Sequence, residues 1–222
     1  MNSSNWQLGS ALALAVLAFV WSAPLAAQSS ELLDVECGPL ENNYGPYDYT
    51  DASHRRDKLP VVEKFHLNAD VENLRRGVSG TIIGDLDYTL RAFPNHHRAL
   101  NATWRYLIAN PSLAVPPYRS ADCYFNRAIR FSPRDSTVRM IYGTYLFKRG
   151  DREGALKRYQ EALDIQPESA EAHYNMGLLQ LELKRFDQAL VHAHKAYAVG
   201  YPLQGLKNRM VRAGKWREAA VP

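Results

Sequence analysis

Apolar side chains recur at helical spacing beyond residue 68. In the segment 80–93, Leu86, Leu90 and Phe93 lie four and three residues apart, so they share one face of a helix, which Pro94 then ends. Together with the glycine and proline breaks, such patterns predict helices over 69–76, 80–93, 95–109, 120–131, 137–149, 152–165, 170–184, 186–199 and 203–213. The predicted fold class is all-α.

The segments between and before these helices are rich in turn-forming residues. Residues 28–60 are expected to form an extended or looped arm, with a short extended stretch over 59–67 and an N-cap at Asn68. Three prolines make 110–117 a loop. The arm carries three tyrosines within 44–49, which leaves two interpretations open. It lies back on the helical body, or it is a flexible extension.

Small residues recur at a fixed step of 34 residues. Gly143 is followed by Gly177 at this step, and alanines and one proline repeat in the same register. The alanine pairs are Ala121 with Ala155, Ala128 with Ala162, Ala155 with Ala189 and Ala162 with Ala196; the proline pair is Pro133 with Pro167. A fixed period of this length is the signature of stacked helical units. Small side chains at the repeated positions let paired helices approach closely.

With this spacing, the chain resembles tetratricopeptide repeats, whose 34-residue unit is two antiparallel helices. The resemblance implies repeats over 95–135, 136–169 and 170–203, the first carrying a five-residue insertion in its loop. It also implies that 61–94 packs on the solenoid and that 204–222 caps its end. The predicted packing residues are Ala121, Ala128, Gly143, Ala155, Ala162, Gly177, Ala189 and Ala196.

Residues 1–27 are predicted to be a secretory signal, not part of the fold. An apolar run over 8–20 is followed by small residues, and cleavage is expected after Ala27. The stretch before the run lacks lysine and arginine, so an uncleaved membrane anchor is the alternative. The whole chain, including the segment 85–97, also resembles an exported bacterial family of repeat proteins. The expected location is therefore the periplasm, with membrane attachment only if the segment is retained.

The chain has two cysteines, Cys37 and Cys123. In an oxidising compartment we expect them to form a disulfide that ties the arm to the helical body. The alternative is a buried thiol at Cys123 and a free thiol at Cys37.

Composition gives little support to catalysis. Lysine and arginine total 27 against 23 acidic residues, and a net charge of +4 is too small to imply nucleic acid. We find no nucleophile elbow, phosphate-binding loop or paired-cysteine motif, so no catalytic residue, cofactor or metal is predicted. The alternative is an enzyme or small-ligand site in the non-repeat region 61–97, with polar groups Asp85, Asp87, His96 and His97.

The predicted function is non-enzymatic binding of a protein or peptide. In tetratricopeptide repeats the first helix of each unit lines the concave face, and the matching residues here are Arg98, Asn101, Arg105, Thr137, Met140, Thr144, Glu171, Tyr174, Asn175 and Leu178. One end of this surface is basic and the other apolar, which suits a peptide with an acidic end. The alternative is that the arm itself fills the groove. By analogy with exported repeat proteins, we expect a role in assembling a cell-envelope complex.

Overall fold

The computed structural model describes residues 37–218, so the predicted signal segment lies outside the described part. Within that part the chain forms eleven α-helices, one 3-10 helix and no strand, which confirms the all-α prediction. The helices are α2 (Ala52–Asp57), α3 (Leu59–His66), α4 (Ala69–Glu72), α5 (Ile82–Ala92), α6 (His97–Ala109), η1 (Pro111–Leu113), α7 (Ala121–Phe131), α8 (Ser136–Lys148), α9 (Arg152–Ile165), α10 (Ala170–Glu182), α11 (Phe186–Ala198) and α12 (Gly205–Arg212).

Most of these helices begin at a side chain that accepts a backbone N–H of the first turn. Asp135 caps α8, Asp151 caps α9 and Ser169 caps α10. Asn68 caps α4 as predicted. Such caps satisfy donors that have no partner within the helix, and each contributes about 1 kcal/mol. The sequence thus fixes where the hairpins start.

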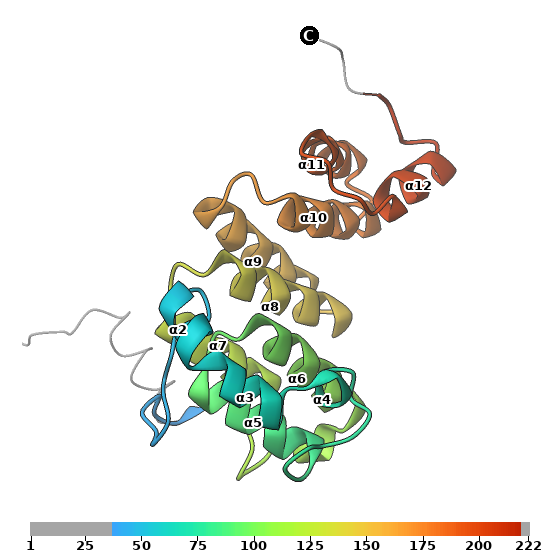
Figure 1. The fold of residues 1–222 in the computed structure, drawn as a ribbon. Helices are drawn as coiled ribbons and strands as arrows, with labels where there is room; N and C mark the ends of the chain where they lie inside the picture. The colour runs from blue at the N-terminus through green and yellow to red at the C-terminus, as the bar shows by residue number, and fades with distance from the viewer. Residues whose placement is uncertain (1–36, 219–222) are drawn as a thin grey trace, which may run out of the picture.

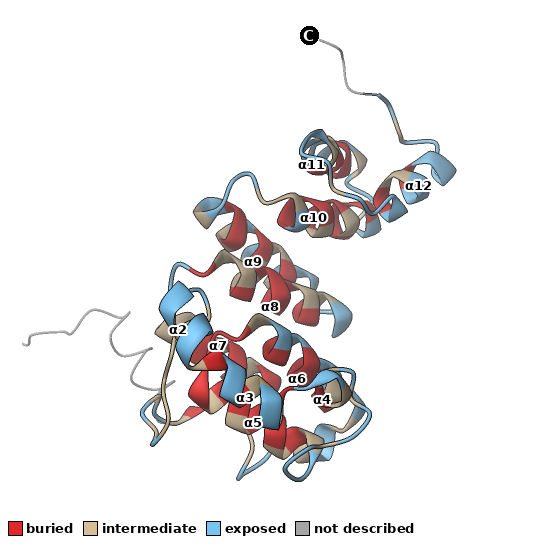
Figure 2. Cartoon of the chain, viewed as in Figure 1, coloured by how far each residue is buried: buried red, intermediate tan, exposed pale blue. Residues whose placement is uncertain are grey.

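Three helical hairpins, α6–α7, α8–α9 and α10–α11, follow one another along the molecule (Figure 1). Their buried faces meet between the helices, and the exposed faces point outward (Figure 2). Ala155, Ala162, Ala189 and Ala196 are completely buried. This agrees with the predicted role of small residues at the helix crossings, and the chain is a solenoid of stacked helical hairpins.

Two predictions about the N-terminal part are wrong. Residues 59–67 were expected to be extended, but α3 occupies most of this stretch, and α2 lies within the predicted arm. Asp51 caps α2, and α3 buries Leu59 and Val62 against Ala92 and Phe93. Each helix spans two turns or fewer, so neither shows a clear period in the sequence; burial against α5 stabilises α3. In addition α4 ends at Glu72, earlier than predicted.

From Cys37 onward the arm lies on the helical body, as the first of the two interpretations predicted. Cys37 and Cys123 form the predicted disulfide. The buried Arg127 guanidinium donates to the carbonyls of Cys37, Gly38 and Pro39. Further along, the backbone N–H of Tyr47 donates to the carbonyl of Ala92, at 2.8 Å. The arm is therefore fixed by a covalent bond and by hydrogen bonds.

A pair of histidines joins the two helices of the third hairpin. His173 Nε2 lies 2.9 Å from the carbonyl oxygen of Pro167, and its Nδ1 lies 2.9 Å from Nδ1 of His192. If Nε2 of His173 donates to that carbonyl, its Nδ1 accepts from His192, and both rings are neutral. Burial, with help from His173 and Lys195, lowers the pKa of His192 to about 4.

This pair should make stability depend on pH. The unfolded chain takes up a proton at His192 near its ordinary pKa of 6.5, whereas the folded chain does so only near 4. The free energy of unfolding should therefore fall as the pH drops from 6.5 to 4, by about 1–2 kcal/mol after allowance for partial exposure. Urea unfolding at pH 7.5 and 4.5 should show a smaller loss for His192→Gln than for wild type. The control His194→Gln should lose as much stability as wild type between the two pH values. A loss for His194→Gln as small as that for His192→Gln would contradict this prediction.

Candidate functional site

A groove of about 410 Å³ lies along the first helices of the three hairpins, α6, α8 and α10. Eight of the ten residues predicted for the concave face line it: Arg98, Asn101, Thr137, Met140, Thr144, Glu171, Tyr174 and Asn175. They come together because residues three and four apart share one face of a helix and the repeat superimposes these faces. Their role in binding stays a prediction.

Two predicted residues lie elsewhere, and two unpredicted ones come from a loop. Arg105 donates to the carbonyl of Glu72, and Leu178 packs with the apolar cluster of the C-terminal helices. Tyr201 and Leu203, in the segment after α11, line the groove instead. The prediction counted positions along helices, and this segment lies after the end of α11. The sequence signal available there is Pro202, which marks the end of a helix but not which side chains face the groove.

The predicted basic end of the groove is already neutralised. Arg98 forms ion pairs with Glu63 on α3 and with Glu72 on α4, so two carboxylates face one guanidinium. His97 Nε2 lies 2.8 Å from Asp135 Oδ2. The non-repeat helices thus supply counter-charges that the sequence interpretation did not include, and this weakens the basis for expecting an acidic segment at this end.

Glu171 is the exception among the charged residues that line the groove. Within residues 37–218 its carboxylate makes no hydrogen bond or ion pair, and His97 acts on it only through its charge. It is accessible to solvent, yet the surrounding protein desolvates it, which raises its pKa, while His97 acts in the opposite direction. Its negative charge also contributes to raising the pKa of Tyr201 to about 12, after the larger effect of burial.

Aromatic and amide groups form the rest of the groove near Glu171. The rings of Tyr174 and Tyr201 lie 4.7 Å apart between centroids. The Asn175 side-chain amide donates to the Met140 sulfur at 3.3 Å. Sulfur is a weak acceptor, so this amide keeps capacity for a stronger partner. The surface offers ring faces, one amide and one carboxylate.

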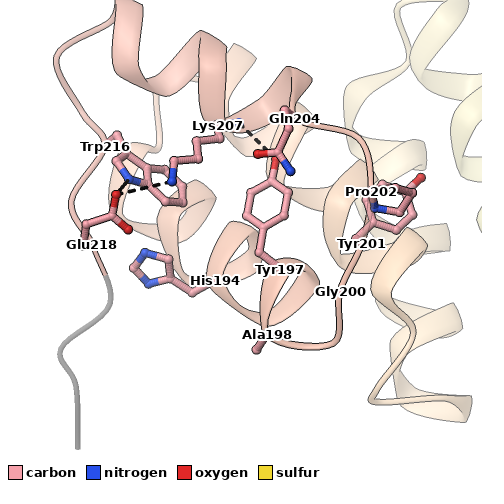
Figure 3. A pocket seen from close by; sticks show the side chains of 10 residues that line it. All are labelled: His194, Tyr197, Ala198, Gly200, Tyr201, Pro202, Gln204, Lys207, Trp216 and Glu218. Atoms are coloured by element: carbon pink, nitrogen blue, oxygen red, sulfur yellow. Dashed lines mark hydrogen bonds and ion pairs between the residues drawn. The ribbon is translucent and has the colours of Figure 1, made fainter.

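A larger pocket, of about 530 Å³, lies at the C-terminal end of the solenoid (Figure 3). Here the segment after α12 folds back so that Trp216 and Lys207 both contact the Glu218 carboxylate, at 2.9 and 3.3 Å. The Tyr197 hydroxyl donates to the carbonyl of Leu203 and accepts from the N–H of Lys207. Because these groups already have partners, the pocket is a seam of the terminal cap. Residues 214–218, which belong to the predicted cap, form no helix.

The polar groups of the alternative site do not converge. Asp85 accepts from the N–H groups of Val78 and Ser79 and contacts His66, whereas Asp87 binds Arg91, Arg119 and Tyr124. His96 contacts Glu63 and caps α6, and His97 contacts Asp135. In the described part of the chain no group of three or more His, Cys, Asp or Glu could hold a metal ion. An active site built from these four groups would require them to face one pocket, and they do not.

Stacked hairpins with a lined concave face define the class of helical repeat scaffolds. The family model for the TPR repeat matches residues 143–184 of this chain. The matched segment, from the second half of α8 through α10, is thus similar to tetratricopeptide repeats, as the sequence predicted for it. Repeats of this kind are typically non-enzymatic scaffolds for protein–protein interaction. Between residues 37 and 218, no helix combines the length and apolar character that crossing a bilayer requires.

Two curated relatives share this repeat region. The chain is 29% identical over 116 residues to DnaJ homolog subfamily C member 7 homolog of Schizosaccharomyces pombe, which covers 43% of this chain and 24% of that protein. It is 36% identical over 78 residues to the probable UDP-N-acetylglucosamine–peptide N-acetylglucosaminyltransferase SPINDLY of Hordeum vulgare, covering 35% of this chain and 8% of that protein. The chain thus spans a quarter or less of these relatives.

Solved structures with a similar arrangement include MamA and YrrB. A crystal structure of MamA is 15% identical with a TM-score of 0.45, covering 73% of this chain and 85% of that one. YrrB, described as a TPR protein with an unusual peptide-binding site, is 22% identical with a TM-score of 0.42, covering 61% of this chain and 65% of that one.

Proposed function

We propose that the protein binds a segment of another polypeptide in the groove of α6, α8 and α10. The observation that carries this proposal is the lining: the first helices of three successive hairpins contribute to one continuous hollow. The half-buried ring of Tyr201, the small exposed part of Tyr174 and the incompletely paired Asn175 amide can contact both side chains and backbone of an extended or helical segment. None of the arm residues from 37 to 60 lines this groove.

Support for an exported role comes from two features. The apolar run near the N-terminus has the composition of a secretory signal, and the disulfide is of the kind that persists in oxidising compartments. We propose that the protein acts in the periplasm, in the assembly or maturation of a cell-envelope complex. Sequencing the N-terminus of the mature protein tests the first part, with Gln28 as the expected first residue. Retention of residues 1–27 in the membrane fraction would favour the anchored alternative.

Site-specific crosslinking tests the groove. A photo-reactive amino acid replaces Asn175 in the groove or, as a control, Glu153 on the outer helix α9. We expect crosslinks to partner polypeptides from the envelope fraction only at position 175, and the crosslinked segment then serves as a peptide probe.

Tyr174→Ala should weaken binding of that probe about tenfold, since buried aromatic contacts dominate such interfaces. Val191→Ala, at an exposed position of α11, should leave it unchanged. Equal crosslinking at both positions would contradict the proposal.

A further inference from the structure

We propose that the groove selects a polypeptide segment carrying a lysine or arginine, whose cation pairs with Glu171 beside the rings of Tyr174 and Tyr201. This inference rests on the proposed function and names the chemistry of the partner. It reverses the expectation from the sequence, which placed a basic surface at this site and an acidic end on the ligand.

The charges around the groove favour a basic ligand. Arg98 faces Glu63 and Glu72, and Asp135 faces His97, so these groups already have partners within the protein. Glu171 lines the same hollow, and in the described residues it has none. An acidic ligand would meet one occupied guanidinium and a free carboxylate, whereas a basic ligand would meet a free carboxylate. Charge complementarity of this kind governs which partners are accepted.

The surroundings of the Glu171 carboxylate also favour a cation. Desolvation by the walls of the groove raises the pKa of Glu171, which means that its charged form is poorly stabilised in the free protein. A cation that enters the groove supplies the missing stabilisation by direct attraction to the carboxylate. Ligand binding should therefore lower this pKa, and Glu171 should be ionised in the complex.

The aromatic surface beside Glu171 suits a long basic side chain. Tyr174 and Tyr201 line the groove together with Glu171 and lie in contact with each other. Ring faces attract lysine and arginine head groups, and they also accept the aliphatic part of these side chains. Met140 and Leu203 extend the apolar surface on which the neighbouring residues of the segment can pack. The same site thus binds both parts of a long basic side chain.

A random peptide library displayed on phage tests the inference on the full-length protein with its disulfide formed. Selection is run in parallel on wild type, on Glu171→Gln, and on Glu153→Gln as a matched control at an exposed position of α9. Peptides that depend on the groove are recognised by their loss of binding to Tyr174→Ala. We expect these peptides to be enriched in lysine or arginine on wild type and on the control, and to lose this enrichment on Glu171→Gln.

The best peptide then serves as the probe for affinities. Replacing its basic residue by glutamine, or Glu171 by glutamine, should each weaken binding about tenfold, and the two changes together little more than either alone. Glu171→Lys should recover affinity for the peptide whose basic residue is changed to glutamate. Such a charge-swapped rescue is not expected from a merely structural role of Glu171.

The outcomes separate the inference from the function on which it rests. Groove-dependent peptides without basic enrichment, or with affinities unaffected by Glu171→Gln, would overturn the inference and leave the proposed function standing. If no selected peptide depends on Tyr174, the groove is not the binding site, and both proposals fail.

Discussion

Removing the disulfide with the double substitution Cys37→Ser and Cys123→Ser is expected to lower the free energy of unfolding by about 4 kcal/mol. The bond joins residues 86 positions apart, so it restricts the unfolded chain strongly. It also holds the start of the arm against α7, where Arg127 donates to the carbonyls of Cys37 and Gly38. Urea unfolding of the oxidised wild type and the double variant measures the difference.

The reduced wild type is the matched control for this experiment. It should unfold at the same urea concentration as the double serine variant, because both lack the bond and little else changes. A loss below about 1 kcal/mol in both proteins would show that the hydrogen bonds of the arm already hold the N-terminal part in place.

Adding a methyl group at Gly143 is expected to be costly, whereas the same change at Gly177 should cost less. A Cβ at Gly143 would lie 2.6 Å from the ring of Tyr159, which is completely buried and hydrogen-bonded to Thr144. A Cβ at Gly177 would meet a terminal methyl of Leu206 at 2.5 Å; this side chain is also completely buried, but a leucine can change rotamer with less displacement than a rigid ring. We expect Gly143→Ala to lower stability by about 1–3 kcal/mol despite its gain in helix propensity.

A double-mutant cycle identifies the cause. One repeat further along, Ala193 stands where Tyr159 stands, so the third repeat lacks the ring that closes on the second. In a Tyr159→Ala background the cost of Gly143→Ala should therefore largely disappear. Equal destabilisation by Gly143→Ala and Gly177→Ala in the wild-type background would contradict this account.

Much of the helical architecture could be predicted because its signals are local. Caps such as Asp151 and Ser169 and breakers such as Gly150 and Pro167 act within one turn of the chain, and they place the helices of the second and third hairpins to within about two residues. Helices α2 and α3 could not be found in this way. They are too short to show a period, and α3 depends on contacts with Ala92 and Phe93, some thirty residues away.

The groove, too, could be predicted only in part from the sequence. Its residues on α8 and α10 follow from helical register, which superimposes Thr137 on Glu171 and Met140 on Tyr174. Its charge does not follow from register. Arg98 was counted as basic surface, but Glu63 and Glu72, 35 and 26 residues earlier in the chain, neutralise it.

The sequence by itself determined the repeat, its period, most of the helical residues that face the hollow and the pair of cysteines able to bond. These depend on spacing along one helix or on a count. Tertiary structure alone decided which charges stay uncompensated and what each repeated glycine contacts, because ion pairs and close packing join segments that are distant in the chain. Glu171 and Gly177 illustrate this: neither differs visibly in the sequence from its neighbours of the same type, and only their surroundings distinguish them.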